Sequence, residues 1–504
     1  MLRRVIALFV PLAVTASVLG FTPAGPAQGA TKNYSVVRAA PKAGGGEPSI
    51  ATDPTNDDRV YISYPGNSMY LYRSDNGGQT WIKGGEPQDF SGDTSVNVDT
   101  SGAVYESNLG GQGIEDTLQA DVFKSFNHGK TFPQHGDGFA VGSNTTNQPF
   151  LVDRQWTDTN IPKGKTTKQG RVYITYHDWA PSQIWVNVSK DGGKTFGPPI
   201  DVITNPPADP DAIAASAQAE QASACDTIPG GVKVVPTNAP ASKHPGRVYV
   251  AWLAGDLATN AGTGCTVTQL QTFHTIWVAW SDDEGDHWTP HLVFDAGPMH
   301  DASALFADFT VDRVGNPYVA FGMNLYDSET TDMFVEGSFD NGVTWNGKSD
   351  GTGAPYRVNI ASGPRATKTN VFPAIAAGDP GKVDVAYVGT SANVPELATG
   401  KVEPGGVADA LWDVYVAQSL NLKSGTPTFS VTKVTDKAIH KGDICVLGIF
   451  CVAPQSDRNL LDFIDIAVDT EGFSHTAFTA DYKDGLRNGI YVANQTGGTR
   501  VLSG

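Results

Sequence analysis

Apolar and polar positions alternate along this chain in short runs, most of them too short for helices. The apolar runs come in pairs, and Asp, Asn or Gly often lies in the turn between the two members. Examples are 48–53 with 59–64, 309–312 with 317–321, 371–376 with 383–387, and 463–468 with 474–478. Short runs bounded by turn residues are typical of strands and hairpins. The pattern predicts antiparallel strand pairs throughout, and only residues 212–224 form an alanine-rich stretch.

Five octapeptides resemble one another, and each follows a strand pair of this kind. Every one has Ser first, Asp or Asn third, Gly fifth and Trp or Phe eighth, and together they occupy residues 74–81, 125–132, 189–196, 281–288 and 338–345. Asp and Asn side chains bond nearby backbone amides, and Gly tolerates the positive φ of a tight turn. We expect each octapeptide to close a turn between two strands and to return its aromatic side chain to the core.

Strand pairs and octapeptides group into seven units, which begin near Glu47, Asp93, Gln148, Cys225, Leu305, Asn370 and Leu460. Each unit holds enough chain for four strands, and one such sheet cannot bury both of its faces by itself. Sheets of this kind stack around an axis. We therefore predict an all-β fold, a single β-propeller of four-stranded blades. Seven blades are favoured and six are the alternative, because an insertion at 257–271 blurs the fourth unit.

Residues 1–30 have the layout of a secretory signal peptide. Arg3 and Arg4 precede an apolar run at 5–20, and small residues follow as far as Ala30. The apolar run is shorter than the roughly 20 residues that a membrane-spanning helix needs. We expect a leader that is removed on secretion, an N-terminal extension at 31–46, and a propeller domain at 47–504. No membrane span is expected.

The net charge of −18 excludes one class of partner. An acidic surface repels phosphate backbones, so we expect no nucleic-acid ligand. Cys225, Cys265, Cys445 and Cys451 are an even and small number of cysteines, which in an exported protein indicates two disulfides. Sequence order favours Cys225 with Cys265 and Cys445 with Cys451.

Metal and cofactor signals are weak in this sequence. Cys445 and Cys451 have no histidine nearby at zinc spacing. Acidic loops could supply oxygen ligands for a structural calcium ion, although no EF-hand spacing is present. We expect no other metal and no cofactor, and a monomeric protein.

The octapeptides resemble the Asp boxes, or BNR repeats, of bacterial sialidases, and the resemblance extends over nearly the whole mature chain. It implies a sialidase-like propeller whose boxes lie on the outer edge, away from substrate. It also implies three arginines on the substrate carboxylate, a tyrosine nucleophile beside a glutamate, and an aspartate acid/base. An Arg-Ile-Pro-like motif opens the family domain, whereas residues 44–50 of this chain place Glu47 where the arginine is expected. The arginines worth considering are Arg154, Arg313, Arg365 and Arg458.

Ligands of propellers commonly bind at one mouth of the central channel, among the loops that enter the innermost strands. Glu47, Asp308 and Asp462 begin inner strands of three units, and we expect them to face one another as the catalytic carboxyl groups. The expected substrate-binding residues, which hold an anionic group, orient a hydroxyl or stack on a sugar ring, are Arg154, His177, Asp178, Trp179 and Arg458. Trp156 is a second candidate for stacking.

These features favour a secreted, carbohydrate-active propeller, a glycoside hydrolase related to sialidases that acts on extracellular glycans. Exo-α-sialidase activity is included in that prediction. Two alternatives remain open. One is a non-catalytic propeller that binds glycan or protein, and the other is a polysaccharide lyase in which His177 or His300 removes a proton beside a uronate.

Overall fold

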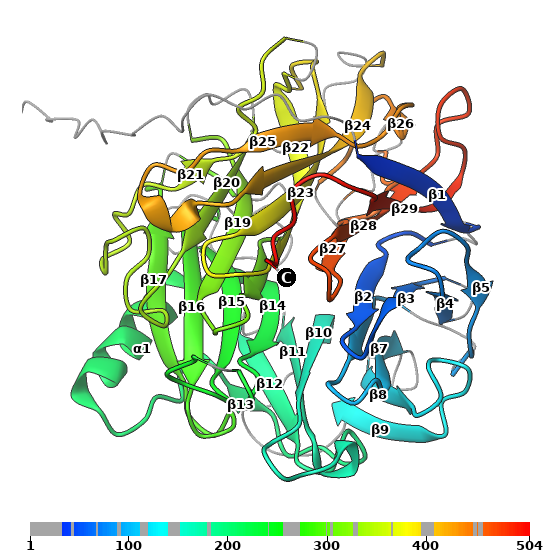
Figure 1. Cartoon of the computed structure of the whole chain (residues 1–504). Coiled ribbons are helices and arrows are strands. Elements are labelled where there is room, and N and C mark those ends of the chain that lie inside the picture. The colour runs from blue at the N-terminus through cyan, green and yellow to red at the C-terminus, as the bar shows by residue number, and fades with distance from the viewer. Residues whose placement is uncertain are drawn as a thin grey trace, which may run out of the picture.

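Seven antiparallel sheets stand around a central axis and form a β-propeller (Figure 1). The computed structural model describes residues 33–41, 45–66, 69–87, 92–110, 119–139, 152–178, 183–239, 241–255, 273–298, 300–302, 306–325, 331–363, 366–394, 408–446, 451 and 457–503. The prediction of an all-β propeller with seven four-stranded blades is confirmed. Each inner strand begins close to the residue at which a unit was expected to begin.

The first three blades each consist of four consecutive strands, which follow one another from the axis outward. Blade one contains β2 (Ser49–Asp53), β3 (Asn56–Tyr64), β4 (Tyr70–Ser74) and β5 (Ile82–Lys83). Blade two contains β6 (Thr94–Val98), β7 (Val104–Gly110), β8 (Gln119–Ser125) and β9 (Gln134–Phe139). Blade three contains β10 (Val152–Asn160), β11 (Arg171–Asp178), β12 (Ile184–Ser189) and β13 (Ile200–Asp201).

The next three blades follow the same plan. Blade four contains β14 (Asp226–Val234), β15 (Val248–Gly255), β16 (Thr275–Ser281) and β17 (Thr289–Asp295). Blade five contains β18 (Asp308–Val311), β19 (Pro317–Met323), β20 (Asp332–Gly337) and β21 (Tyr356–Arg357). Blade six contains β22 (Thr369–Ala377), β23 (Val383–Thr390), β24 (Leu411–Ser419) and β25 (Ser430–Lys433), and β26 (His440–Lys441) pairs with the start of β24.

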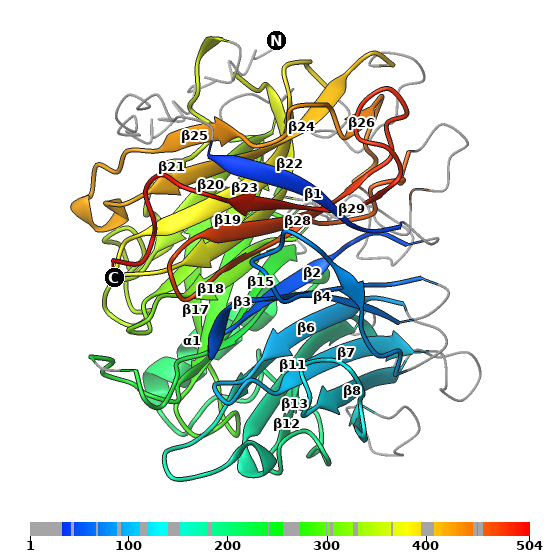
Figure 2. The same ribbon diagram turned by 45° about the vertical axis from the view of Figure 1, so that its right-hand side comes forward.

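The last blade is built from both ends of the chain. Its inner strands are β27 (Asp465–Val468), β28 (Ser474–Ala480) and β29 (Gly489–Gln495), and its outer strand is β1 (Tyr34–Ala40). β1 runs antiparallel to β29, with Tyr34 opposite Gln495 and Val37 opposite Val492 (Figure 2). β1 comes from the stretch that we expected to form an extension ahead of the propeller. Its hydrogen bonds to β29 instead make it the fourth strand of blade seven.

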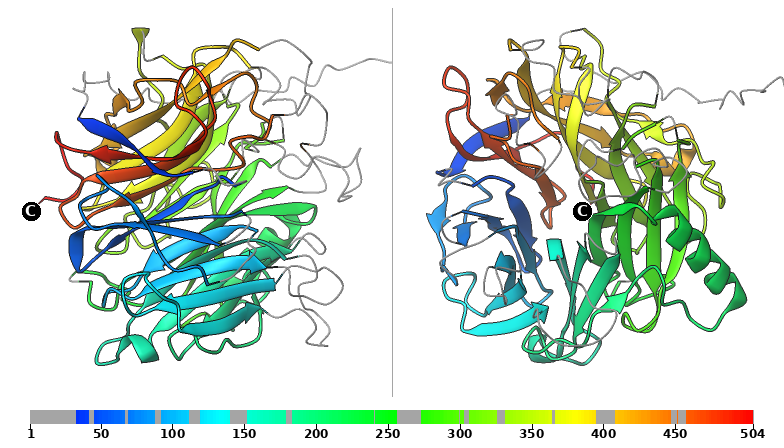
Figure 3. Two further views of the ribbon diagram at one scale, coloured as in Figure 1. Left: turned by 90° about the vertical axis from the view of Figure 1, so that its right-hand side faces the viewer. Right: turned by 180° about the vertical axis from the view of Figure 1, so that it is seen from behind.

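Helix is scarce in the described residues. The alanine-rich stretch forms α1 (Pro210–Ala222), which packs against β17 on the outside of the propeller (Figure 3). Its N-cap is Asp209, whose side chain accepts a hydrogen bond from the amide of Asp211, as N-terminal helix residues require. Short 3₁₀ helices span Thr167–Gln169 and Leu422–Ser424. None of the helices in these residues is both long and apolar enough to cross a membrane.

The octapeptides form the turns between the third and fourth strands. In the fifth one, the Gly342 amide donates to Ser338 Oγ (2.8 Å), and the Thr344 amide donates to Asp340 Oδ1 (2.8 Å). The Trp345 indole N–H donates to the Gly342 carbonyl (3.1 Å). The aromatic residues do not return to the core equally. Trp288 and Trp345 are fully buried, whereas the octapeptides of blades one to three end in partly buried residues, namely Trp81, Phe132 and Phe196.

Hydrophobic clusters fill the seams between neighbouring blades. Tyr249 and Ile276 of blade four, for example, pack with Phe309 and Phe321 of blade five. Strands such as β15 are buried along their whole length because a blade covers each of their faces. The innermost strands contact one another in a closed circle, in the order β2, β6, β10, β14, β18, β22 and β27. This packing fixes the positions of the residues that begin each inner strand.

One of the two expected disulfides is described completely. Cys445 is bonded to Cys451. Cys225 is also in a disulfide, but Cys265 lies outside the described residues, and the pairing of these two stays a prediction. The expected leader at 1–30 also lies outside the described residues.

Candidate functional site

A repeated register places chemically distinct residues near the start of five inner strands. In four blades the strand ends at an aspartate whose carboxylate accepts the amides of the next turn, namely Asp53, Asp99, Asp312 and Asp469. Six positions before these four aspartates lie Glu47, Asp93, Phe306 and Phe463. Six positions before Asn160, at the end of β10, lies Arg154. Glu47, Arg154 and Phe306 also share a positive φ. These residues therefore begin their strands at one level around the axis.

Glu47 lies at the centre of a group of charged residues at this level. It is 3% exposed, its Oε1 accepts the Asp462 amide (2.9 Å), and its carboxyl group is hydrogen-bonded to that of Asp93. Burial raises the pKa of Glu47 well above its ordinary value, and the charges of Asp462 and Asp93 raise it further, against Arg154 and Arg458. Glu47 therefore holds a proton at pH values where an exposed glutamate has lost it.

Asp462 and Arg458 form an ion pair beside Glu47. Arg458 Nε donates to Asp462 Oδ1 (2.9 Å), and its Nη2 donates to Oδ2. Arg458 Nη2 also lies 3.8 Å from Glu47 Oε1. Burial alone would lower the pKa of Arg458, but the hydrogen bond and charge of Asp462 raise it. The guanidinium and the carboxylate therefore form an ion pair joined by two hydrogen bonds. The group thus combines a protonated carboxyl, Glu47, with a carboxylate, Asp462.

Arg154 is buried among aromatic rings next to this group. Its guanidinium carbon lies 3.6 Å from the Trp156 ring centroid and 4.1 Å from that of Phe463, and the residue is 2% exposed. Nη1 donates to the Thr94 carbonyl (3.4 Å), while Nε and Nη2 find no hydrogen-bond partner among the described residues. Burial lowers the pKa of Arg154, although Asp93 and Glu47 counter it. Trp156, considered above for sugar stacking, packs against this guanidinium.

His177 approaches the same level from β11. Its Nδ1 lies 2.6 Å from the Thr227 carbonyl, which can only accept, so Nδ1 carries hydrogen. Its Nε2 lies 3.8 Å from Asp153 Oδ2. Burial opposes protonation, but Asp153 and Asp226 outweigh it and raise the pKa of His177. Asp178 is buried at the end of β11, and Trp179 lies outside the described residues.

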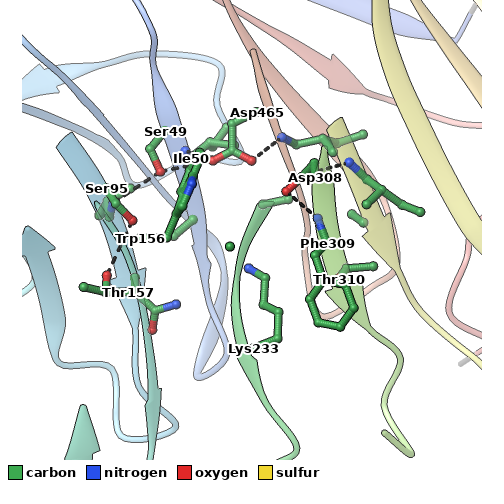
Figure 4. Close-up of a pocket in the computed structure, with 18 of the residues that line it drawn as sticks. Ser49, Ile50, Ser95, Trp156, Thr157, Lys233, Asp308, Phe309, Thr310 and Asp465 are labelled. Carbon is green, nitrogen blue, oxygen red and sulfur yellow. Dashed lines mark hydrogen bonds between the residues drawn. The ribbon is translucent and has the colours of Figure 1, made fainter. Parts of the chain in front are cut away.

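Asp308 occupies a different level. It stands two positions further along its strand than Phe306, on the wall of the central channel (Figure 4). Its Oδ2 accepts the Ile375 amide of blade six (2.7 Å), and its Oδ1 accepts the Phe309 amide (2.8 Å). Within the described residues, no hydrogen bond or ion pair joins it to Glu47 or Asp462. The expected convergence of three carboxyl groups is therefore observed only for Glu47 and Asp462.

The channel forms a polar cavity of about 230 Å³. Asp465 mirrors Asp308 on its wall, because its Oδ2 accepts the Ile50 amide of blade one (2.8 Å). Burial, together with the charge of Asp465, raises the pKa of Asp308 to about 7. The Lys233 side chain reaches into the same space (Figure 4). Asp308 thus links the inner strands of blades five and six, and Asp465 links those of blades seven and one.

Two groups of described residues have the geometry to hold a metal ion. The first is Asp121, His135 and Asp137, and the second is His440, Asp457 and Asp481. The second adjoins Arg458. His440 uses both ring nitrogens, Nδ1 toward Asp481 Oδ1 (2.8 Å) and Nε2 toward the Asp443 carbonyl (2.9 Å). Burial alone would lower the pKa of His440, but Asp481 and Asp457 outweigh burial and raise it. In this arrangement a protonated His440 supplies the positive charge among these carboxylates.

The other residues considered from the sequence lie apart. His300 Nδ1 contacts the Asn324 carbonyl (3.2 Å). Arg313 pairs with Asp379 (2.8 Å) beyond the end of its inner strand, and Arg365 lies outside the described residues. Sequence reasoning missed Asp93 as a site residue, although a unit was placed there. Its register, equal to that of Glu47 and Arg154, was the signal that could have found it.

No protein-family model matches the chain, and no curated protein matches it. Among solved structures, an ulvan lyase is 12% identical with a TM-score of 0.47, over 90% of this chain and 95% of that one. The Hadza microbial sialidase is 12% identical with a TM-score of 0.41, over 88% and 74%. YCF48 bound to D1 peptide is 10% identical with a TM-score of 0.43, over 94% and 98%. Likeness at this level carries no functional argument, and the fold assignment rests on the sheets described above.

Proposed function

We propose that this protein is a secreted glycoside hydrolase that acts on extracellular glycans, with Glu47 as the acid and Asp462 as the carboxylate partner. The observation that carries the proposal is the contrast within one group at the inner-strand starts. Glu47 is held protonated by burial and by its acidic neighbours, while Asp462 is paired with a guanidinium. A carboxyl group that keeps its proton beside a carboxylate paired with a guanidinium is the equipment of acid/base hydrolysis.

The proposed reaction uses each of these groups once. Glu47 donates its proton to the glycosidic oxygen as the bond from that oxygen to the anomeric carbon breaks. Asp462 accepts a proton from the water that attacks the anomeric carbon. Arg458 has about a third of its side chain exposed (31%), and it is the cation of the group best placed to meet an anionic sugar substituent.

Secretion is part of the proposal. It is supported by the basic, apolar and small-residue order of residues 1–30. It is supported also by the Cys445–Cys451 disulfide, since disulfides persist mainly in oxidising compartments.

The test is product analysis by mass spectrometry after incubation with sialylated glycans and with plant and bacterial polysaccharides. We expect wild-type protein to release a sugar, and Glu47→Gln to fold normally but release none. Turnover by Glu47→Gln would remove Glu47 from the mechanism. Intact glycans across the whole panel, from protein shown to be folded, would refute hydrolysis and favour a binding propeller.

Polysaccharide lyase activity is the second candidate, and His177 favours it. With hydrogen on Nδ1, its Nε2 faces Asp153 beside Arg154, which places a base near a cation that could neutralise a uronate. A lyase product contains a new carbon–carbon double bond and has gained no water. The same mass spectra therefore separate the two candidates, because hydrolysis adds the mass of one water and elimination does not.

A further inference from the structure

The contact between Glu47 and Asp93 joins two neighbouring blades at the start of their inner strands. We propose that Asp93 is a positioning residue that keeps the proton on Glu47, and that the two carboxyl groups share one proton across this seam. The inference rests on the proposed function, in which Glu47 is the acid. It adds a residue that does not react itself but determines the pH range over which Glu47 is protonated.

The backbone on both sides holds the two carboxyl groups together. The Asp93 carbonyl accepts the Gln155 Nε2 of blade three (2.7 Å) and the Leu109 amide of blade two (2.9 Å), so its main chain is fixed from two directions. Glu47 has a φ of 51°, a strained conformation for a residue with a side chain. In this conformation its carboxyl group meets both Asp93 and the Asp462 amide.

The charged neighbours of the pair cancel one another, two negative against two positive, and so do not offset two negative charges on the pair. Asp462 and Asp153 bring negative charge, and Arg154 and Arg458 bring positive charge. Arg458 is already committed to Asp462, and Arg154 Nη1 donates to a carbonyl. Two ionised carboxylates in contact repel each other strongly in a buried site, so one of them retains a proton. Burial together with these neighbours raises the pKa of both groups.

A shared proton has a direct consequence for turnover. When Glu47 gives its proton to the glycosidic oxygen, Glu47 and Asp93 become two anions in contact. The proton that Asp462 takes from the attacking water can then return to this pair, and the acid is loaded for the next cycle. The acid form persists to a higher pH than it would on an isolated glutamate, so activity extends further into the alkaline range.

The test follows the protonation of Glu47 directly, in full-length protein whose glutamate side-chain carboxyl carbons are labelled with ¹³C. The Glu47 signal is assigned by its loss in Glu47→Gln. Asp93→Asn removes one negative neighbour, so we expect the signal to titrate lower by about one pH unit or more. The alkaline limb of kcat/KM should move with it. Asp384→Asn is the matched control, a buried carboxyl in β23 whose loss should move neither.

An unchanged Glu47 titration in Asp93→Asn overturns the inference. A shifted titration in a protein that cleaves no glycan supports the shared proton and overturns only the proposed hydrolysis. If Asp93→Asn does not fold, the wild-type titration decides the matter. With aspartate carboxyl carbons labelled as well, a Glu47 signal that responds to two ionisations, its own and that of Asp93, would support the inference, and a single Glu47 ionisation unaffected by Asp93 would overturn it.

Discussion

Trp345 offers the sharpest test of how the octapeptides hold the blades. It ends the octapeptide at 338–345, its side chain is fully buried, and it packs in the seam between blades four and five with Tyr249 and Phe309. Trp81 ends the octapeptide at 74–81 in the same way, yet it is only partly buried. Both indole N–H groups donate to a glycine carbonyl of their own turn, at 3.1 and 3.0 Å. The two tryptophans therefore differ in burial while sharing their hydrogen bond.

That difference sets the expected magnitudes. Trp345→Ala removes a wholly buried indole and leaves a cavity, which costs about 3–5 kcal/mol. Trp81→Ala loses the same hydrogen bond but less buried apolar area, so about 1–2 kcal/mol is expected. The sequence alone predicts equal losses at the two positions, because the octapeptides are equivalent there.

The measurement is urea unfolding followed by far-ultraviolet circular dichroism, since tryptophan fluorescence changes when the residue itself is removed. An equal dependence on urea in the three proteins shows that the midpoint shift reports stability. A loss for Trp345→Ala no larger than that for Trp81→Ala would refute the argument that burial in the seam decides the contribution of these residues.

Two further predictions concern pH and redox state. Burial raises the pKa of Glu106 to about 8, so folded wild type binds a proton that the unfolded chain lacks, and stability falls as pH rises from the ordinary glutamate range through about 8. Glu106→Gln should flatten this fall in a series of thermal midpoints, and parallel curves would contradict it. Replacing Cys445 and Cys451 by serine should cost about 2 kcal/mol, as for a short closed loop. It should also raise KM, because the Cys445 amide holds the Asp457 carbonyl (2.8 Å) beside Arg458; an unchanged KM would separate the disulfide from the site.

The blades were predictable because their signals are local. Strand alternation, the Asp and Gly of the turns and the closing aromatic residue all act within a few neighbouring positions. β1 lacks such a signal, because nothing in residues 34–40 says that their partner lies near the other end of the chain. The difference between Trp81 and Trp345 is likewise invisible in the octapeptides, since burial depends on the neighbouring blade.

The site was predictable only in part, because a shift of two positions along a strand changes the level that a side chain occupies. Glu47 and Asp462 were selected as residues at inner-strand starts, and the structure brings them into contact. Asp308 fitted the same description, but its register places it further along the channel, where it binds the Ile375 amide. Asp93 has the register of Glu47, but nothing in the sequence around it distinguishes it from an aspartate that caps a turn.

The contact between Glu47 and the Asp462 amide has a consequence for how the protein is made. Glu47 belongs to the first blade to be synthesised, and the amide that it binds belongs to Asp462, 415 residues later. A ribosome-bound chain can fold its early blades in order, but the group around Glu47 cannot assemble until nearly the whole sequence has emerged. Contacts between such distant residues form late in folding, because the chain between them must be ordered first. The site is therefore completed only when blade seven has folded, and a chain that stops after blade six keeps Glu47 and Asp93 but lacks Arg458 and Asp462.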